Sequence, residues 1–562
     1  MKEKKNLGKM NKITNLKKIV IVFCSLLLSL NIYGQGGTWV WMHGSDLPKP
    51  NAIYGQKGVS SPLNQPGMLY EAIEWKDLAG NFWVYGGRLR SLPGTPANAV
   101  LWKYEIAINE WTWVHGDTAF GVAPVYGVKG VPSPTNTPGE RTFGGTTWTD
   151  LNGDLWFFSA CTILTVIPDL WRYNIATNQW TWISGESSPS AFGKNGIKGV
   201  PSASNYPPPR GESACSWTDS KNNLWLFGGS GPFDNLNDVW KYNISTNEWS
   251  WEFGANGGLV YPVYGIIGVE SPSNDPGSRC VYSRYFDGGN NLYIFGGTGI
   301  NGNHSDIWKY NLTSGMWTWV GGPNGLNDNG SYTAYCDDND INLPANRMES
   351  RTSCGNSCGL WIFGGSSNSA TELNDLWHYS FKTNSFEWVS GSGSQMLTQN
   401  CGTKGVPSSS NYPAGKNGGN AWLDDEGNFW MFGGWQYNTL WKFIPDKECM
   451  SCVTEKDTTK INPEKVEEFP VLFIPNVFTP NGDGQNDLFE IVNKGYDEFK
   501  LSIYDRWGVK MFQTNENNLF WNGNLSQTGN EASAGTYYYS LDLRENKTKK
   551  THFYRGYLTL IR

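Results

Sequence analysis

Charged residues are scarce in this chain of 562 residues: Asp, Glu, Lys and Arg make up 17% of it, and there are only five histidines. The whole chain carries a net charge of −7 and its first 34 residues carry +6, so the remainder carries −13. An acidic body without a basic run lacks the surface that nucleic-acid binding requires, so we expect no nucleic-acid partner. No apolar run approaches the roughly 20 residues of a membrane-spanning helix, so we expect no transmembrane segment in the mature chain.

Glycine and aromatic residues are abundant instead, with 67 Gly, 29 Trp and 15% aromatic residues in all. Such a composition displaces the strong helix formers and favours turns and short strands. It also supplies enough apolar surface for a large core, which excludes wholesale disorder. The first expectation is therefore an all-β protein.

Residues 1–34 have the pattern of a secretory signal peptide. Lys17 and Lys18 precede the apolar run 19–30, and the small residue Gly34 suits a cleavage site before Gln35. This predicts a secreted protein. Nine cysteines then remain, and we expect disulfides within the set Cys336, Cys354, Cys358 and Cys401. Cys449 and Cys452 form a CxxC pair, for which a local disulfide is favoured over a redox or zinc site.

An aromatic-aliphatic stretch that ends in Gly-Gly recurs along the chain, as in Phe82–Gly87 and Phe429–Gly434. The first position of the pair falls at residues 86, 159, 228, 296, 364 and 433, with a degenerate copy at 159. Each copy is followed by an element like Leu101-Trp102-Lys103-Tyr104, and five copies have a further aromatic element nine residues after its Trp, such as Trp111-Thr112-Trp113. With one more strand before each Gly-Gly, the pattern predicts four short strands repeated six times, which is a six-bladed propeller.

The two ends of the array complement each other. The sixth copy lacks the last aromatic element, whereas Trp39-Val40-Trp41 stands unpartnered at the beginning. The N-terminal strand is therefore expected to complete the last blade. The strand, Gly-Gly and Trp pattern resembles the kelch repeat of galactose-oxidase-like propellers and covers about 37–445, so we assign 35–445 to a kelch-like propeller. In such propellers the loops before the first strand and after Gly-Gly share one face, which would be the binding surface. The first kind is long here, as in Tyr54–Pro62 and Tyr264–Pro272.

Basic residues recur 17 or 18 positions before Gly-Gly, and aspartates recur two positions before the repeated Trp. The four blades with an arginine are also the four with an aspartate. The alternatives are a cationic ring that binds anions and a set of structural ion pairs, which co-occurrence favours. The predicted pairs are Arg141 with Asp169, Arg210 with Asp238, Arg279 with Asp306, and Arg347 with Asp375. Lys416 takes the basic position in the sixth blade.

No catalytic motif stands out, so no catalytic residue is assigned and the chain is predicted not to be an enzyme. Irregular residues near the Gly-Gly loops are the candidates for ligand binding: Arg88, Arg90, Phe233, Trp435 and Tyr437. The predicted function is that of a secreted or cell-surface binding protein whose propeller loop face recognises a glycan or a protein. The alternative is an extracellular carbohydrate-active enzyme, an isomerase or an oxidase.

The tail changes character. Residues 446–472 are polar and predict a linker, and 473–562 contain several short strands that suggest a small immunoglobulin-like β-sandwich. The opening 473–487, together with 503–508 and Trp521-Asn522-Gly523, resembles the gliding-motility-associated C-terminal domain, the type B sorting signal of type IX secretion. The resemblance implies handling by the type IX secretion machinery and an extracellular or outer-surface location.

Alternating oxygen side chains in the same opening could bind calcium, the one cofactor considered. The candidate ligands are Asn481, Asp483 and Asp487. An EF-hand loop would place a glutamate where Val492 stands, and Asx turns explain the same residues equally well.

Overall fold

The computed structural model describes residues 35–562 except 90–96, 163–165, 190–191, 213–214, 338–340, 370–371, 447–470, 476, 483–485, 495, 516–519, 527 and 546–550. It divides into two compact units, Met1–Thr454 and Glu455–Arg562, and the boundary falls in the segment predicted to be a linker. The predicted signal peptide, Arg90, Asp483, Cys449 and Cys452 lie outside the described residues.

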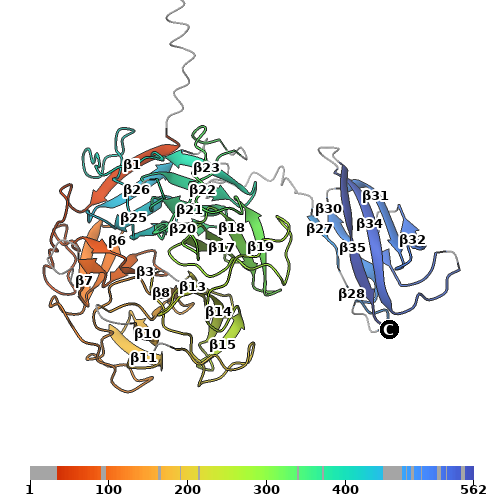
Figure 1. Cartoon of the computed structure of the whole chain (residues 1–562), viewed down its shortest axis with the longest axis horizontal. Helices are drawn as coiled ribbons and strands as arrows, with labels where there is room; N and C mark the ends of the chain where they lie inside the picture. The colour runs from red at the N-terminus through yellow and green to blue at the C-terminus, as the bar shows by residue number, and fades with distance from the viewer. Residues whose placement is uncertain are drawn as a thin grey trace, which may run out of the picture. The chain divides into compact units, whose positions relative to one another are not determined.

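The first unit is a ring of six four-stranded antiparallel sheets (Figure 1). Blade 1 consists of β3 (Ile73–Lys76), β4 (Phe82–Tyr85), β6 (Leu101–Glu105) and β7 (Glu110–His115). Blade 2 consists of β8 (Thr146–Thr149), β9 (Leu155–Phe158), β10 (Asp169–Asn174) and β11 (Gln179–Gly185). Blade 3 consists of β12 (Cys215–Thr218), β13 (Asn223–Ser230), β14 (Asn235–Asn243) and β15 (Glu248–Phe253). Blade 4 consists of β16 (Ser283–Phe286), β17 (Asn291–Phe295), β18 (Ile307–Asn311) and β19 (Met316–Gly321). Blade 5 consists of β20 (Ser353–Asn356), β21 (Gly359–Phe363), β22 (Leu376–Ser380) and β23 (Ser385–Ser390). The predicted six-bladed propeller is confirmed.

The sixth blade joins the two ends of the array. It contains β24 (Gly419–Leu423), β25 (Phe429–Gly433), β26 (Leu440–Pro445) and, as its outermost strand, β1 (Gly37–His43). Strand β1 runs antiparallel to β26, with Trp39 opposite Phe443 and Trp41 opposite Trp441. The N-terminal strand therefore closes the ring, as the repeat pattern predicts.

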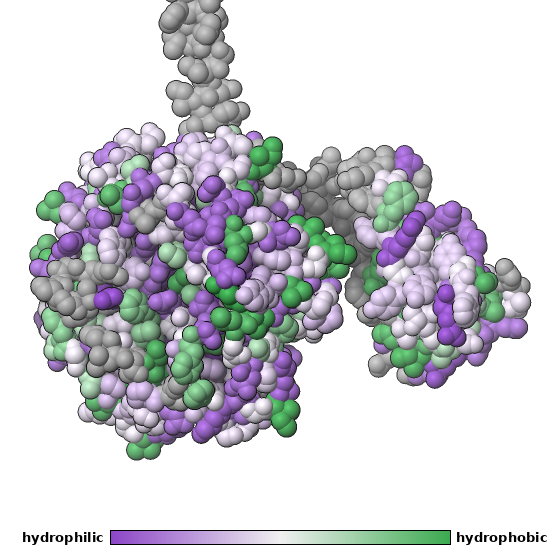
Figure 2. Space-filling model, viewed as in Figure 1, coloured by the Kyte–Doolittle hydropathy of each residue, from purple (hydrophilic) through white to green (hydrophobic). Residues whose placement is uncertain are grey.

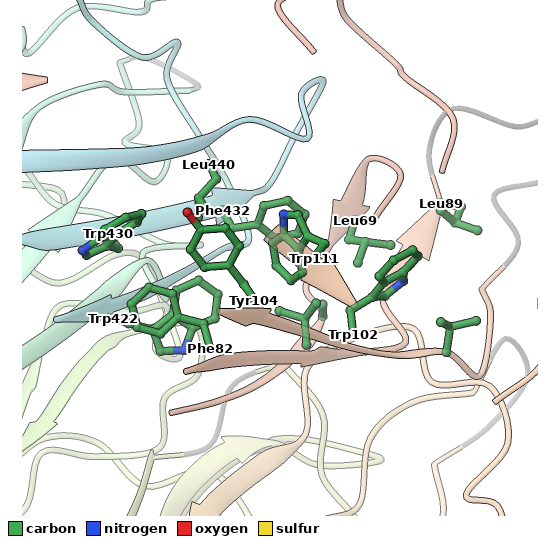
Figure 3. Packing of buried hydrophobic residues seen from close by; sticks show 13 residues of the cluster. Leu69, Phe82, Leu89, Trp102, Tyr104, Trp111, Trp422, Trp430, Phe432 and Leu440 are labelled. Carbon is green, nitrogen blue, oxygen red and sulfur yellow. The ribbon is translucent and has the colours of Figure 1, made fainter. Parts of the chain in front are cut away.

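Aromatic side chains fill the space between neighbouring blades. At the seam between blades 6 and 1, the rings of Phe82 and Trp422 stack with centroids 4.6 Å apart, and Trp111 packs against Phe432 (Figure 3). Full burial of one such side chain contributes roughly 1.5–3 kcal/mol. Most of the repeated aromatic residues are therefore core residues.

The long loops that precede the first strands cap the outer edges of the blades. In blade 1 the amide of Gly58 donates to the carbonyl of Trp113 on the outermost strand, and Lys57 lies 4.5 Å from that Trp ring. The ammonium of Lys57 also donates to the carbonyl of Gly116. The same arrangement holds Lys129 on Trp182, Lys198 on Trp251 and Lys404 on Trp41. These loops cover strand edges that would otherwise offer unpaired backbone groups to other chains, so their first role is structural.

Blade 5 reaches the same result with a different insert. The ring of Tyr335 packs 4.0 Å from that of Trp388, and its hydroxyl donates to the carbonyl of Gly391. Within this region Cys336 and Cys358 are disulfide-bonded, whereas Cys354 and Cys401 are free thiols. The expectation of disulfides thus holds for two of the four cysteines and is wrong for the other two.

The second unit is also all-β. Its main sheet has the order β28 (Val477–Phe478), β35 (Thr551–Leu560), β34 (Gly535–Glu545), β31 (Tyr496–Tyr504) and β32 (Lys510–Thr514), with β28 parallel to β35. Two short ladders pair β27 (Val471–Phe473) with β30 (Val492–Lys494) and β29 (Phe489–Glu490) with β33 (Phe520–Trp521). Phe489 and Trp521 of the second ladder share a core with Leu501 and Leu541 of the main sheet. In the part of the chain that the structure describes, no helix is long and apolar enough to cross a membrane.

Replacement of Trp39 tests ring closure. Its side chain is 1% exposed, so Trp39→Ala is expected to lower the free energy of unfolding by about 3–5 kcal/mol. Deletion of 35–44 should destabilise the propeller further because it exposes β26. Denaturant unfolding followed by tryptophan fluorescence measures both. The control is Trp507→Ala, at a side chain that is 80% exposed, and equal stability of Trp39→Ala and this control would contradict the closure.

Candidate functional site

Each of four blades buries an arginine–aspartate pair between two repeated motifs. In blade 3, Nη1 and Nη2 of Arg210 lie 2.8 and 2.9 Å from the two carboxylate oxygens of Asp238, and Nη1 also donates to the carbonyl of Gly228. Asp238 accepts a further hydrogen bond from the indole of Trp240. The closest contacts in the other blades are Arg141–Asp169 at 2.5 Å, Arg279–Asp306 at 2.7 Å and Arg347–Asp375 at 2.9 Å.

All eight side chains are at most 2% exposed, so no ligand reaches them. In blades 3, 4 and 5 the arginine also donates to the carbonyl of the first glycine of Gly-Gly, so the pair fastens this turn to the strand that carries the repeated Trp. The geometry of the pairs sets the acidity of the aspartates. Burial disfavours the ionised form of Asp306, but the bidentate Arg279, the charge of His304 and the indole of Trp308 together lower the pKa of Asp306. Arg141 reaches only one oxygen of Asp169, so burial dominates there and the pKa of Asp169 is raised.

A double-mutant cycle tests the structural role of the pairs. Arg210→Met is expected to destabilise the protein by about 3–5 kcal/mol, because Asp238 is left buried without its counter-charge. Combination with Asp238→Leu should recover much of that loss. Urea denaturation of the two single variants and the double variant gives the coupling energy. Additive losses would show that the two side chains act independently.

Blade 6 departs from this arrangement. Lys416 takes the basic position and Thr439 takes the place of the aspartate, so the ammonium donates to Thr439 Oγ1 (3.3 Å) and to the carbonyl of Gly433 (2.9 Å). The side chain is fully buried, and burial lowers the pKa of Lys416 to about 7 although the neighbouring Cys401 opposes the shift. Lys416 is therefore a source of pH-dependent stability.

The sign of this dependence follows from proton binding. The ordinary lysine pKa is 10.5, so the unfolded chain binds more protons between about pH 7 and pH 10.5, and the contribution of Lys416 to stability rises with pH over that interval. Lys416→Met is expected to raise the melting temperature most at pH 7 and below, with a gain that declines towards pH 10.5. Thermal unfolding across this range measures the effect. The control is Lys221→Met, at an exposed lysine outside the caps, and a gain independent of pH would contradict the assignment.

The innermost strands surround a central channel whose mouth is a ring of backbone. One residue from each blade contributes: Glu71, Phe143, Glu212, Val281, Glu349 and Gly418. Hydrogen bonds link neighbouring blades, from Gly144 N to Glu71 O, Glu71 N to Gly418 O, Gly418 N to Glu349 O, Ser350 N to Val281 O, and Val281 N to Glu212 O, at 2.9–3.4 Å. We call these six residues the channel mouth. Glu71, Glu212, Val281 and Glu349 adopt left-handed φ angles of 50–56°, a conformation that residues other than glycine rarely adopt.

The three glutamates of the channel mouth come from alternate blades and influence one another. Burial, the charge of Glu349 and a hydrogen bond to its carboxylate raise the pKa of Glu71 well above its usual range, although Arg351 opposes the shift. Burial and Glu349 likewise raise the pKa of Glu212. Glu71 is 1% exposed, whereas Glu212 and Glu349 are half-buried. Glu71 therefore holds its proton to higher pH than an exposed glutamate does, and the proton lies in its hydrogen bond to Glu349.

An aromatic cluster lies beside this ring. The guanidinium of Arg88 lies 5.1 Å from the ring of Phe143, which meets Tyr70 edge-on at 6.3 Å. Tyr70 in turn meets the ring of Trp435 at 6.1 Å. Phe143 and Trp435 remain partly exposed, so they offer a platform next to the carboxylates.

Charged side chains fill the channel below the mouth. Arg284 of blade 4 reaches across to Glu74 of blade 1 (3.4 Å), and Arg351 of blade 5 donates to the carbonyl of Ala72 (2.9 Å) and lies 3.7 Å from Glu74. Asn420 of blade 6 donates to Glu74 as well. Arg284, Arg351 and Glu74 are at most 10% exposed. This network joins blades 1, 4, 5 and 6 across the channel.

The structure connects two of the predicted binding residues and separates the others. Arg88 and Trp435 join the cluster through Tyr70 and Phe143. Tyr437 is only 7% exposed and packs over Lys416, while Phe233 is 70% exposed and pairs with Phe192, their centroids 5.6 Å apart. Hydrophobic groups on the face seen in Figure 2 are small and separated by hydrophilic residues. Sequence reasoning missed the three glutamates. The available signal was their shared place, two residues after Leu69, Arg210 and Arg347, in alternate blades.

The predicted calcium ligands are only partly described. Asp487 Oδ1 accepts hydrogen bonds from the amides of Asn481 (3.0 Å) and Gly482 (2.7 Å), which is turn chemistry. Among the described residues, no three His, Cys, Asp or Glu side chains are placed to hold one metal ion, and this includes the glutamates of the channel mouth.

Comparison with known proteins identifies both units. Residues 192–394 match the model of the KLHDC2/KLHL20/DRC7 Kelch-repeats domain, and residues 472–560 match that of the CHU_C Type IX secretion signal domain. No curated protein matches the chain. The chain therefore contains a kelch-repeat propeller followed by a type IX secretion signal domain, which indicates secretion to the cell surface or the extracellular space.

Proposed function

We propose that this protein is an exported binding protein whose propeller recognises a glycan or a protein at the channel mouth, without catalysing a reaction. The observation that carries the proposal is the pair of partly exposed rings of Phe143 and Trp435, joined through the buried Tyr70, beside three carboxylates and Arg88. Aromatic platforms with a few charged groups are typical of ligand recognition. The buried network across the channel supports a site at the surface, because its charged groups are already paired with one another.

A second candidate function rests on the Glu71–Glu349 pair. The raised pKa of Glu71 lets this carboxyl hold a proton next to a second carboxyl group, and a pair of carboxyls that supplies and removes protons is the chemistry of a sugar isomerase. This candidate predicts turnover of a bound sugar that Glu349→Gln abolishes without loss of binding. An oxidase has no comparable support among the described residues.

The binding proposal predicts a difference between two aromatic residues. Trp435→Ala should weaken binding at least about tenfold, or about 1.4 kcal/mol, because it removes part of the platform. The matched control is Phe233→Ala, at an exposed aromatic residue outside the cluster, which should leave affinity unchanged. The full-length protein is screened on glycan and peptide arrays, and hits are quantified by calorimetry. Hits that depend on Phe233 and not on Trp435 would move the site away from the channel mouth.

A further inference from the structure

The main sheet of the second unit carries a row of tyrosines on its outer face. Tyr504 of β31 lies opposite Tyr538 of β34, which lies opposite Tyr557 of β35, and these three strands are neighbours in the sheet (Figure 1). Directly opposed residues point to the same face and lie about 5 Å apart, so the three side chains follow one another across the sheet. Tyr538 is 49% exposed and Tyr557 is 60% exposed, whereas Tyr537 and Leu558, which point to the other face, are buried in the core. The row therefore faces away from the core.

The tyrosine row borders a hollow of about 630 Å³. Ser540 and Arg555 lie opposite each other in the next outward-facing row and line the same hollow. The site thus combines aromatic rings with a serine hydroxyl and a guanidinium. Aromatic walls with a few polar groups are the mixture by which ligand sites bind and orient a small molecule.

The position of the hollow within the sheet restricts how a partner can bind. The part of β34 from Tyr538 to Ser540 pairs with β31 on one side and with β35 on the other. Its backbone is therefore used in both ladders, and a peptide cannot add a strand to it. A strand added at the edge of the sheet would lie beside the hollow and leave it empty. A ligand of the hollow must approach from above and place a flat surface against the tyrosine rings.

The hollow contains a positive charge that has no counterpart in this part of the protein. Arg555 is exposed, and among the described residues its guanidinium has no acidic partner. Lys500 and Asp542 lie opposite each other in the following row, so their charges offset one another. Arg555 is the one residue with a basic or acidic side chain among those that line the hollow. The hollow is therefore complementary to an anionic group.

We propose that this hollow binds a uronic acid unit of an acidic polysaccharide on the surface of the producing cell and so retains the exported protein there. The apolar face of the sugar ring packs on Tyr538 and Tyr557, and its hydroxyls bond to the tyrosine and Ser540 hydroxyls. The carboxylate accepts paired hydrogen bonds from the planar guanidinium of Arg555. A uronic acid carries its carboxylate on the ring itself, whereas an acidic peptide side chain would reach Arg555 without offering a ring face to the tyrosines.

The source of the polysaccharide follows from the domain that carries the hollow. Residues 472–560 match a type IX secretion signal domain, which brings the protein to the surface of the cell that makes it. The polysaccharide coat of that cell is therefore the first one that the hollow meets. The inference concerns the second unit and goes beyond the function proposed for the propeller.

Binding is measured by calorimetry with the full-length protein and three hexasaccharides as probes: hexagalacturonate, its fully methyl-esterified form and cellohexaose. We expect hexagalacturonate to bind at least about tenfold more tightly than the other two, because only its carboxylates carry a charge for Arg555. Its affinity should fall as salt is added, since an exposed ion pair is screened. Equal affinity for the methyl ester would overturn the proposal.

Variants locate the site. Arg555→Gln and Tyr557→Ala should each weaken hexagalacturonate binding at least about tenfold. The matched controls are Arg506→Gln and Trp507→Ala, at an exposed arginine and an exposed tryptophan of the same unit that do not line the hollow, and both should bind like the unmodified protein. Thermal melts establish that the variants are folded. An equal loss in Arg506→Gln would show general attraction between charges and overturn the proposed site.

Trp435→Ala separates this inference from the proposed function. It should leave hexagalacturonate binding unchanged, because Trp435 belongs to the propeller. If Trp435→Ala abolishes that binding and Arg555→Gln does not, the sugar binds at the channel mouth, so the inference fails and the proposed function stands.

Retention is tested in the producing cells by fractionation. Full-length Arg555→Gln should move from the cell surface into the medium, whereas Arg506→Gln should stay on the cells. If Arg555→Gln accumulates inside the cells instead, the hollow serves the secretion machinery and the inference is overturned. Unchanged retention of Arg555→Gln would overturn it as well.

Discussion

The antiparallel ladder between β1 and β26 is the constraint on which the rest of the propeller depends. It ties together strands about 400 residues apart in sequence and brings blade 6 against blade 1. The channel mouth exists only when this seam is closed, because the hydrogen bond from Glu71 to Gly418 crosses it. The network that fills the channel also crosses it, through Asn420 and Glu74. A local pairing of two strands thus determines whether the candidate site is assembled.

The blades are stabilised first by backbone pairing of their strands and then by interactions between buried charged side chains. Short aromatic strands form the sheets and Gly-Gly turns reverse the chain, and in blades 3, 4 and 5 a buried arginine–aspartate pair links the turn to the strand that follows. The pair satisfies several groups at once, since one aspartate accepts from an arginine, an indole and, in three blades, a loop tyrosine such as Tyr126. Blade 6 has neither the arginine nor the aspartate, and burial there lowers the pKa of Lys416, which takes the basic position.

The fold was largely accessible from the sequence because its determinants are periodic. The repeated Trp, the Gly-Gly turns and the unpartnered Trp39-Val40-Trp41 suffice for the number of blades and the closure. The capping role of the long loops could not be predicted from the sequence, because Lys57 contacts the ring of Trp113, which lies far from it along the chain. The glutamates were missed for another reason: their importance depends on a left-handed backbone and on neighbours from other blades. Arg88 and Trp435 were found because they are irregular, but nothing in the sequence joins them through Tyr70 and Phe143.

The loops that cap the blade edges bear on the order in which the strands of the propeller become paired during folding. Strand β1 is made first, yet its partner β26 comes last in the propeller, so its aromatic residues wait unpaired while five blades form. Pairings between segments so distant in sequence form slowly, and exposed strand edges promote association in that interval. A lysine clamped over a tryptophan protects the outer edge of each of several blades as soon as that blade is complete. The strand edge that stays open to association longest is therefore that of blade 6, which is covered only when β1 pairs with β26.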